Sequence, residues 1–226
     1  MRVLKRNVIF WGKNVLLNLG YSLVGTLLLI IFIGTGNNRM HQNFLSFMVP
    51  MFPYYLFMVG FFVNTIMGQS NFRVYFRVLL SMGITRREAT AGFLGSLAAS
   101  NLGIMLLAWL IWALVPGELS GKGLQMFSLL SGVLFVTAGV IAICGTVVMR
   151  WGKIGSIVTG ILYMVLGGGW GFLLSYAIEK GLNEGFLIWT ADISQNICRR
   201  VLAVGLGGFL LCGLFAAYTL RKTEVR

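Results

Sequence analysis

Few residue types in this sequence could carry acid–base, nucleophilic or metal chemistry. The 226 residues include six carboxylates, three cysteines and a single histidine, His41, which has no second histidine for a metal pair and no nucleophile spaced to use it as a base. Cys144 and Cys212 fall inside apolar runs, Cys198 lies near the outer end of the last run, and no spacing is typical of a metal site. We interpret the cysteines as small packing residues. We expect no catalytic, cofactor-binding or metal site in this chain.

The carboxylates also lie in connections or at the ends of apolar runs: Glu88, Glu118, Glu179, Glu184, Asp192 and Glu224. Ion-driven transporters commonly carry an ionisable residue deep in a span, and an intramembrane acid protease needs two close carboxyls. The sequence favours neither class, although neutral ion sites remain open. The nearest approach to a phosphate-binding loop, Gly117 to Lys122, has the wrong glycine spacing and is followed by Gly123 instead of Ser or Thr. Energy for uphill transport would therefore come from another polypeptide.

These polar residues separate long apolar runs. Hydrophobic residues make up 58% of the chain, charged residues 11%, and the mean hydropathy is +0.86, which is too apolar for a water-soluble globule. A helix needs about 20 apolar residues to cross the hydrocarbon of a bilayer, and continuous apolar runs do not fit the alternating strands of a barrel. We predict an all-α polytopic membrane protein. Its six transmembrane helices are expected over residues 15–33, 47–67, 91–115, 126–149, 154–178 and 201–220.

The basic residues are distributed unequally between the predicted connections. Thirteen of the 18 Lys and Arg fall in one set of compartments: Arg2, Lys5, Arg6, Lys13, Arg73, Arg77, Arg86, Arg87, Arg150, Lys153, Arg221, Lys222 and Arg226. The positive-inside rule then makes both termini cytoplasmic. This bias explains most of the net charge of +12, so we expect anionic membrane lipids and not nucleic acid as a charged partner.

The N-terminal segment has an amphipathic pattern. On a helical wheel its four cations lie together, while the apolar side carries Val3, Leu4, Val8, Trp11 and Val15. The pattern predicts an interfacial elbow helix over residues 1–14. A solvated tail that only satisfies the positive-inside rule is the alternative.

The connection at residues 68–90 is the most informative segment. A short helix from about Phe72 to Met82 is predicted, with Ser70 or Asn71 as its cap and Gly83 as its terminator. Thr85 and Glu88 have capping-box spacing for the next helix. The short helix combines Tyr75, Phe76, Leu79 and Leu80 with Arg73 and Arg77, and is more apolar than a solvated connection requires. It would dock on a partner, or lie among lipid headgroups as an interfacial belt.

The stretch from Leu79 to Glu88, reading LLSMGITRRE, resembles the cytoplasmic signature of six-helix ABC exporter permeases of the ABC-2 type. The resemblance implies one transmembrane domain over residues 1–226 of a bacterial plasma membrane protein, which pairs with a second permease copy as a homodimer or heterodimer. It also implies that residues 68–90 couple to a separate cytoplasmic ATPase, which binds ATP and Mg²⁺, while this chain is no enzyme. The implied coupling residues are Arg73, Tyr75, Phe76, Arg77, Leu79, Leu80, Arg86 and Arg87, with Thr85 and Glu88 as the helix cap.

Within that family, small permeases resemble exporters of amphipathic peptides such as bacteriocins or phenol-soluble modulins, although lipid and drug exporters look similar. The outer connection at residues 179–200 would be re-entrant or a folded cap. A face with Met51, Tyr55, Met58 and Phe62 could line a path for an apolar peptide, or simply pack against lipid and other helices. Gly167, Gly168 and Gly169 would allow close helix packing or act as a hinge. The rival from another class is a membrane scaffold or sensor that recruits a cytoplasmic partner without transport.

Overall fold

The computed structural model describes the backbone of residues 2–35, 44–70, 74–113, 121–179 and 195–222. Over these ranges the chain is helical apart from the turn at residues 82–85, and no strand occurs in them, which confirms the all-α prediction. The helices are α1 (Arg2–Thr35), α2 (Phe44–Ser70), α3 (Phe76–Ser81), α4 (Arg86–Ala113), α5 (Gly121–Glu179) and α7 (Gln195–Lys222).

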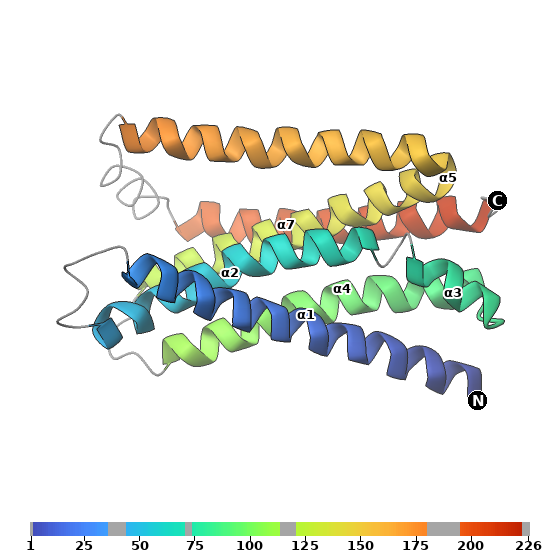
Figure 1. Cartoon of the computed structure of the whole chain (residues 1–226), viewed down its shortest axis with the longest axis horizontal. Coiled ribbons are helices and arrows are strands. Elements are labelled where there is room, and N and C mark those ends of the chain that lie inside the picture. The colour runs from blue at the N-terminus through green and yellow to red at the C-terminus, as the bar shows by residue number, and fades with distance from the viewer. Residues whose placement is uncertain (1, 36–43, 71–73, 114–120, 180–194, 223–226) are drawn as a thin grey trace.

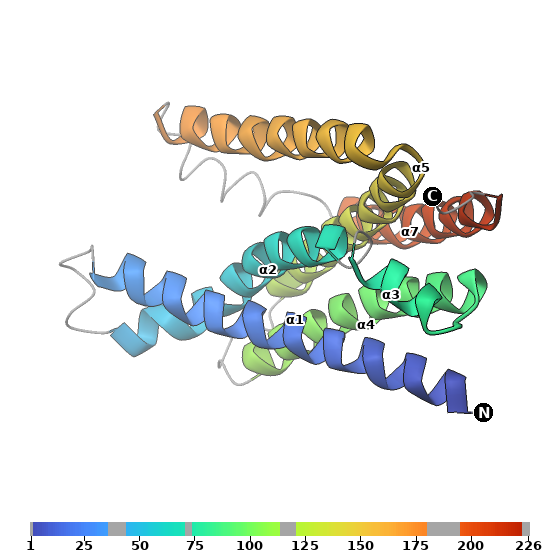
Figure 2. The same cartoon turned by 45° about the vertical axis from the view of Figure 1, so that its right-hand side comes forward.

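The long helices run roughly along one common axis, as Figures 1 and 2 show. α1 packs against α2 and α4, and α5 packs along α7. Both chain ends, the short α3 and the bend of α5 lie at the same end of this bundle (Figure 1). We call this end the basic end, because exposed Lys and Arg side chains gather there.

Four helical stretches in the described part of the chain are long and apolar enough to cross a membrane. They are Asn7–Phe32, Arg86–Ala113, Phe127–Met164 and Arg199–Leu220, and the apolar stretch Phe52–Gly68 of α2 is shorter. The chain is therefore a membrane-embedded helical protein. The number of six spans and the cytoplasmic position of the termini stay predictions.

α5 bends sharply at Gly152. This glycine has φ 57° and ψ −120°, a conformation that side-chain-bearing residues rarely adopt, and the helix axis reverses there (Figure 2). A Cβ at Gly155 would lie 2.5 Å from the carbonyl oxygen of Val147, so the two arms approach closely next to the bend. The predicted spans 126–149 and 154–178 are thus the two arms of α5. Gly167–Gly169 lie within the helical second arm, and their role in close packing or as a hinge stays a prediction.

α1 differs from the prediction of a separate elbow helix. It runs as one helix of 34 residues from Arg2 to Thr35 with no break near residue 14. At 1.5 Å per residue its length is about 51 Å, whereas the hydrocarbon is about 30 Å thick. The amphipathic N-terminal segment therefore forms the first turns of α1. The buried Trp11 packs these turns against the bundle.

Glycines set the closest helix contacts in the bundle. A Cβ at Gly132 would lie 2.6 Å from the carbonyl oxygen of Val201, so α5 and α7 touch through their backbones. A Cβ at Gly60 would lie 2.6 Å from Ile104 Cδ1, and one at Gly103 would lie 2.9 Å from the Leu19 side chain. Small residues let membrane helices approach in this way. They hold α1, α2 and α4 together at mid-length.

Candidate functional site at the basic end

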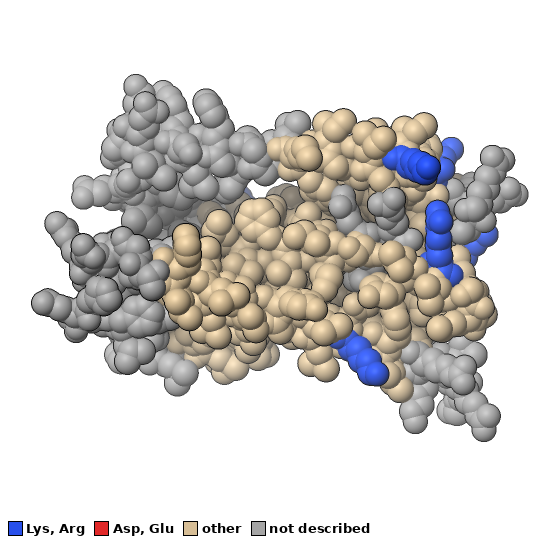
Figure 3. All heavy atoms as spheres, viewed as in Figure 1, with Lys and Arg blue, Asp and Glu red and all other residues tan. Residues whose placement is uncertain are grey.

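The basic end collects exposed cations from four helices, α1, α3, α4 and α5. Figure 3 shows Lys and Arg gathered at this end of the viewed face, and no Asp or Glu is seen on that face outside the grey atoms. The exposed cations with described side chains here are Lys13, Arg77, Arg87, Arg150 and Lys153. Such a surface suits anionic headgroups or an acidic protein face.

α3 ends in a Schellman motif. The Gly83 N–H donates to the Leu80 carbonyl at 3.1 Å and the Ile84 N–H donates to the Leu79 carbonyl at 3.1 Å. Gly83 has φ +80°, as the residue after the helix cap requires. Leu79 and Ile84 are both buried in one cluster, which supplies the apolar contact that accompanies this motif. Gly83 therefore ends the helix as its sequence position predicts.

A capping box starts α4 two residues later. Thr85 N–H donates to Glu88 Oε2 at 3.1 Å, and Glu88 N–H donates to Thr85 Oγ1 at 3.3 Å. Ile84 precedes this cap and is buried in the same cluster as Ala89, the position expected for a hydrophobic staple. Ile84 thus takes part both in the Schellman motif that ends α3 and in the hydrophobic staple at the start of α4. The turn holds the two helices in a fixed relative position.

The start of α3 differs from the prediction. The helix begins at Phe76 and has no side-chain cap at its N-terminus, where Tyr75 is the N-cap residue. Ser70 belongs to α2 instead, because its hydroxyl donates to the Ile66 carbonyl at 3.1 Å. Asn71, Phe72 and Arg73 lie outside the described residues.

The apolar face of α3 points into the protein. Phe76 and Leu79 are each 1% exposed and pack in a cluster with Trp11 of α1 and Phe93 of α4. Their predicted role as a docking surface is therefore wrong as it stands, because this chain already covers both side chains. Their burial instead fixes α3 between two long helices.

Aromatic contacts join the same three helices. The Trp11 ring lies 5.8 Å from that of Phe93, and the Phe10 ring lies 5.3 Å from that of Tyr75. Asn7 Nδ2 donates to the Glu88 carbonyl at 3.0 Å, which adds a polar link between α1 and α4. A Cβ at position 92 would overlap the Trp11 indole, so a glycine is required there.

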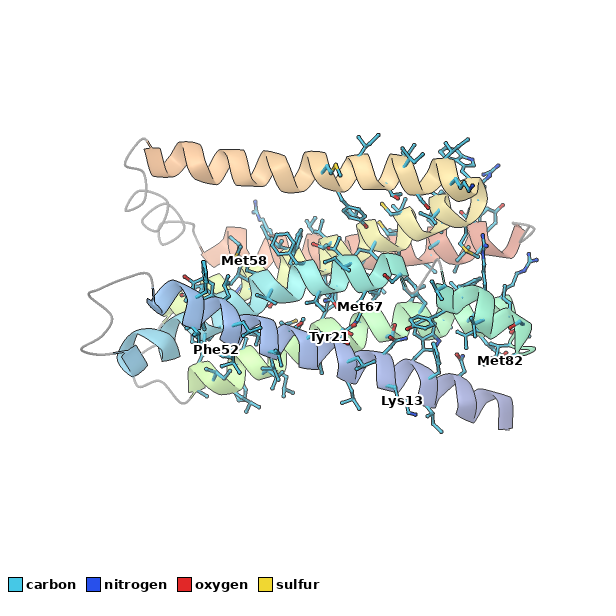
Figure 4. The ribbon with its side chains drawn as sticks, in the orientation of Figure 1. Lys13, Tyr21, Phe52, Met58, Met67 and Met82 are labelled. Atoms are coloured by element: carbon cyan, nitrogen blue, oxygen red, sulfur yellow. The ribbon has the colours of Figure 1, made fainter. Side chains whose placement is uncertain are left out.

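The remaining predicted coupling residues divide by exposure. Arg77 and Arg87 are exposed, Tyr75 is 36% exposed, and Leu80 and Arg86 are half-buried. Val74, Val78 and Met82 add exposed apolar surface, and Figure 4 shows Met82 at the outer tip of the basic end. The outer face of α3 is therefore mixed basic and apolar. We call Val74, Arg77, Val78, Met82 and Arg87 the outer face.

The face predicted as a translocation path is exposed in this chain. Met58 and Phe62 are each about half exposed and lie on α2, and Tyr55 is half-buried (Figure 4). The Phe61 ring lies 5.4 Å from that of Phe62. The Met51 side chain lies outside the described residues. A single copy of the chain thus leaves this face open to lipid or to another protein.

Sequence reasoning missed a buried polar stripe on α1. Asn7, Asn14, Asn18, Ser22 and Thr26 are all buried, at helical spacing. The signal was the recurrence of Asn, Ser and Thr every four residues from Asn14 to Thr26 in an otherwise apolar run.

A metal-binding constellation is not found in the described part of the chain, where no three His, Cys, Asp or Glu lie together. No protein-family model, curated protein or solved structure matches this chain.

Proposed function

We propose that this chain is the permease subunit of an ABC exporter, energised by a separate cytoplasmic ATPase. The observation that carries the proposal is the anchoring of α3. Its inner face is buried against α1 and α4, while its outer face stays exposed among cations. This is the arrangement that a short coupling helix needs.

The anchoring explains how a partner could act on the membrane helices. Isolated helices as short as the six residues of α3 are not stable in water, so α3 exists because of its contacts with the bundle. A push on its outer face passes through Phe76 and Leu79 to Trp11 on α1 and Phe93 on α4. Dense packing transmits such displacements because it leaves little free volume. The chain thereby converts movement of a bound ATPase into movement of two long helices.

The partner supplies the chemistry in this proposal. ATP and Mg²⁺ bind to the ATPase, and this chain binds the ATPase through the outer face. Arg77 and Arg87 favour an acidic surface on that partner and speed the encounter. Val78 and Met82 supply apolar contact area. In this proposal the exposed residues of the outer face contact the ATPase, and the buried Phe76 and Leu79 do not.

The transport proposal also assigns roles to the membrane helices and to a second copy of the chain. We infer six spans with both termini in the cytoplasm of a bacterial cell, since this places the basic end inside. A second permease copy would complete the translocation path, with Met58 and Phe62 facing it, and amphipathic peptides are the substrate class that we propose. A scaffold that recruits a partner without transport would use the same basic end, so only a functional assay separates the two.

Charge reversal on the outer face tests recruitment. The chain would be co-expressed with a candidate ABC-type ATPase of the same organism, purified from membranes, and assayed for bound ATPase and ATP hydrolysis. Arg77→Glu with Arg87→Glu should weaken binding by about tenfold or more, because two favourable exposed pairs become repulsive. Arg199→Glu is the matched control, since Arg199 is exposed near the start of α7, far from the outer face.

Three outcomes are distinct. Recruitment and hydrolysis that both fall only in the double variant support the proposal. An ATPase that binds without any substrate export in the unmodified protein favours the scaffold. Failure of the unmodified chain to bind any ATPase rules out the permease.

Orientation has its own test. In a background without Cys144, Cys198 and Cys212, a cysteine at Ser70 should react with an impermeant thiol reagent from the cytoplasmic side. A cysteine at Ser120 should react from outside. Labelling of Ser70 from outside would contradict the orientation.

A further inference from the structure

We propose that the middle of the bundle contains a binding site for water, formed by four polar side chains of α1, α2 and α4. These are Asn18, Asn64, Ser100 and Asn101, and we call them the asparagine layer. Each is at most 3% exposed. The inference is independent of the transport proposal.

Hydrogen bonds connect the layer across four helices. Asn18 Nδ2 of α1 donates to Ser100 Oγ of α4 at 3.3 Å. Asn64 Nδ2 of α2 donates to Asn101 Oδ1 of α4 at 2.7 Å. Asn101 Nδ2 then donates to the Leu134 carbonyl of α5 at 3.1 Å. Because Ser100 and Asn101 are adjacent, the side chains from α1 and α2 meet at one level of α4.

The layer lies inside the bundle at mid-length of α4. Asn101 lies near the centre of α4, which runs from Arg86 to Ala113, about 20 Å from either end at 1.5 Å per residue. Figure 4 shows Tyr21 of α1 and Met67 of α2, which lie one turn from Asn18 and Asn64 along their helices. On α1 and α2 the layer lies nearer the basic end, since Asn18 is five residues from Lys13 and Asn64 is six residues from Ser70, where α2 ends.

Two amides of the layer are only half satisfied. Asn18 Oδ1 and Asn64 Oδ1 are buried and have no hydrogen-bond partner among the residues that the structure describes. A buried acceptor without a partner is unfavourable, because no hydrogen bond compensates the loss of its hydration. Both oxygens therefore need a donor that the described residues do not supply.

Water fits this requirement better than a cation does. It donates two hydrogen bonds and accepts two, so it can serve an amide oxygen or an amide N–H, and internal waters usually bind to otherwise unsatisfied polar groups. A cation would use only the oxygens and would bring an uncompensated charge into the interior of the bundle, since none of the four side chains of the layer is a carboxylate. The occupant is therefore water, donating to Asn18 Oδ1 and Asn64 Oδ1.

Two buried side chains near the layer serve as controls for the absence of water contact. Thr26 Oγ1 donates to the Ser22 carbonyl at 2.6 Å, and this bond satisfies the hydroxyl group. Ile104 is fully buried one turn from Asn101 and is apolar. Neither side chain should contact water.

Water-edited solid-state NMR on isotopically labelled protein in lipid bilayers measures this directly. Magnetisation from water should reach the side chains of Asn18, Asn64 and Asn101 at least several-fold faster than those of Thr26 and Ile104. Build-up for the asparagines as slow as for Ile104 would overturn the proposal.

Stability measurements separate water from an ion. The thermal midpoint of the unmodified protein should be the same in sodium, potassium and choline chloride at equal concentration. A sodium- or potassium-specific rise that disappears in Asn64→Leu but persists in Thr26→Val would show a cation site and overturn the water site. The NMR measurement and the comparison of salts are both made on the unmodified protein. They therefore still test the proposal if one variant misfolds.

Discussion

Replacement of Phe76 by alanine tests whether the buried cluster holds α3 in place. Phe76 is 1% exposed and lies with Leu79, Trp11 and Phe93. Removal of a buried phenylalanine side chain costs about 3–5 kcal/mol. α3 has six residues and cannot form alone, so most of this loss should appear as local opening. At 1.4 kcal/mol for each factor of ten, the open population should rise about 100-fold or more.

Backbone amide hydrogen exchange in membranes or detergent reports this opening. The amides of Met82, Gly83 and Ile84 are suitable reporters, because their N–H groups donate to carbonyls of α3. In Phe76→Ala their exchange should become about 100-fold faster, up to the limit set by complete opening. Arg77→Ala is the control at the next position. Arg77 is exposed, so the change should stay within a factor of about two or three.

The reasoning fails if exchange at these three amides is unchanged in Phe76→Ala while the variant inserts normally. Such a result would mean that contacts other than the buried cluster position α3. Equal acceleration by Arg77→Ala would also contradict it, since the exposed face would then contribute as much as the buried one.

Three further perturbations follow from local geometry. Gly92→Ala should lower the thermal midpoint of the purified protein, because the added Cβ overlaps the Trp11 indole, whereas Gly95→Ala meets nothing within 4 Å and should leave the midpoint unchanged or raised. Glu88→Ala should destabilise the first turn of α4 by about 1 kcal/mol and speed exchange there, with Glu88→Gln retaining most of the protection as a capping-box residue; equal effects of both would argue against the cap. Gly152→Ala should strain the bend of α5 by about 1–2 kcal/mol at φ 57°, seen as a lower midpoint, and an unchanged midpoint would show that the bend can relax.

The contrast between sequence and structure is clearest at α3. The helix end at Gly83 and the cap formed by Thr85 and Glu88 were predictable, because both depend on the backbone and side chains of a few consecutive residues. The burial of the Phe76 side chain inside the protein was not predictable in this way. An amphipathic short helix has the same pattern whether its apolar side meets a partner, lipid or its own chain.

The same limit applies to α1 and α5. Composition was sufficient to identify a helical membrane protein, and the basic Arg150–Lys153 segment marked the reversal between two apolar runs. That α1 continues without an elbow depends on Trp11 fitting over Gly92, a contact between residues 81 positions apart. No local pattern records such a fit.

The sequence by itself determined the class of the protein, its helices and the turn that joins α3 to α4, since hydropathy, capping and φ preferences are local properties. Only the tertiary structure decided which side chains meet. It buried Phe76, paired Asn64 with Asn101, and left one end of the Asn18 amide unpartnered. The physical reason is that burial and hydrogen-bond satisfaction depend on the relative rotation of packed helices. A small rotation that changes no local preference would give a different set of contacts.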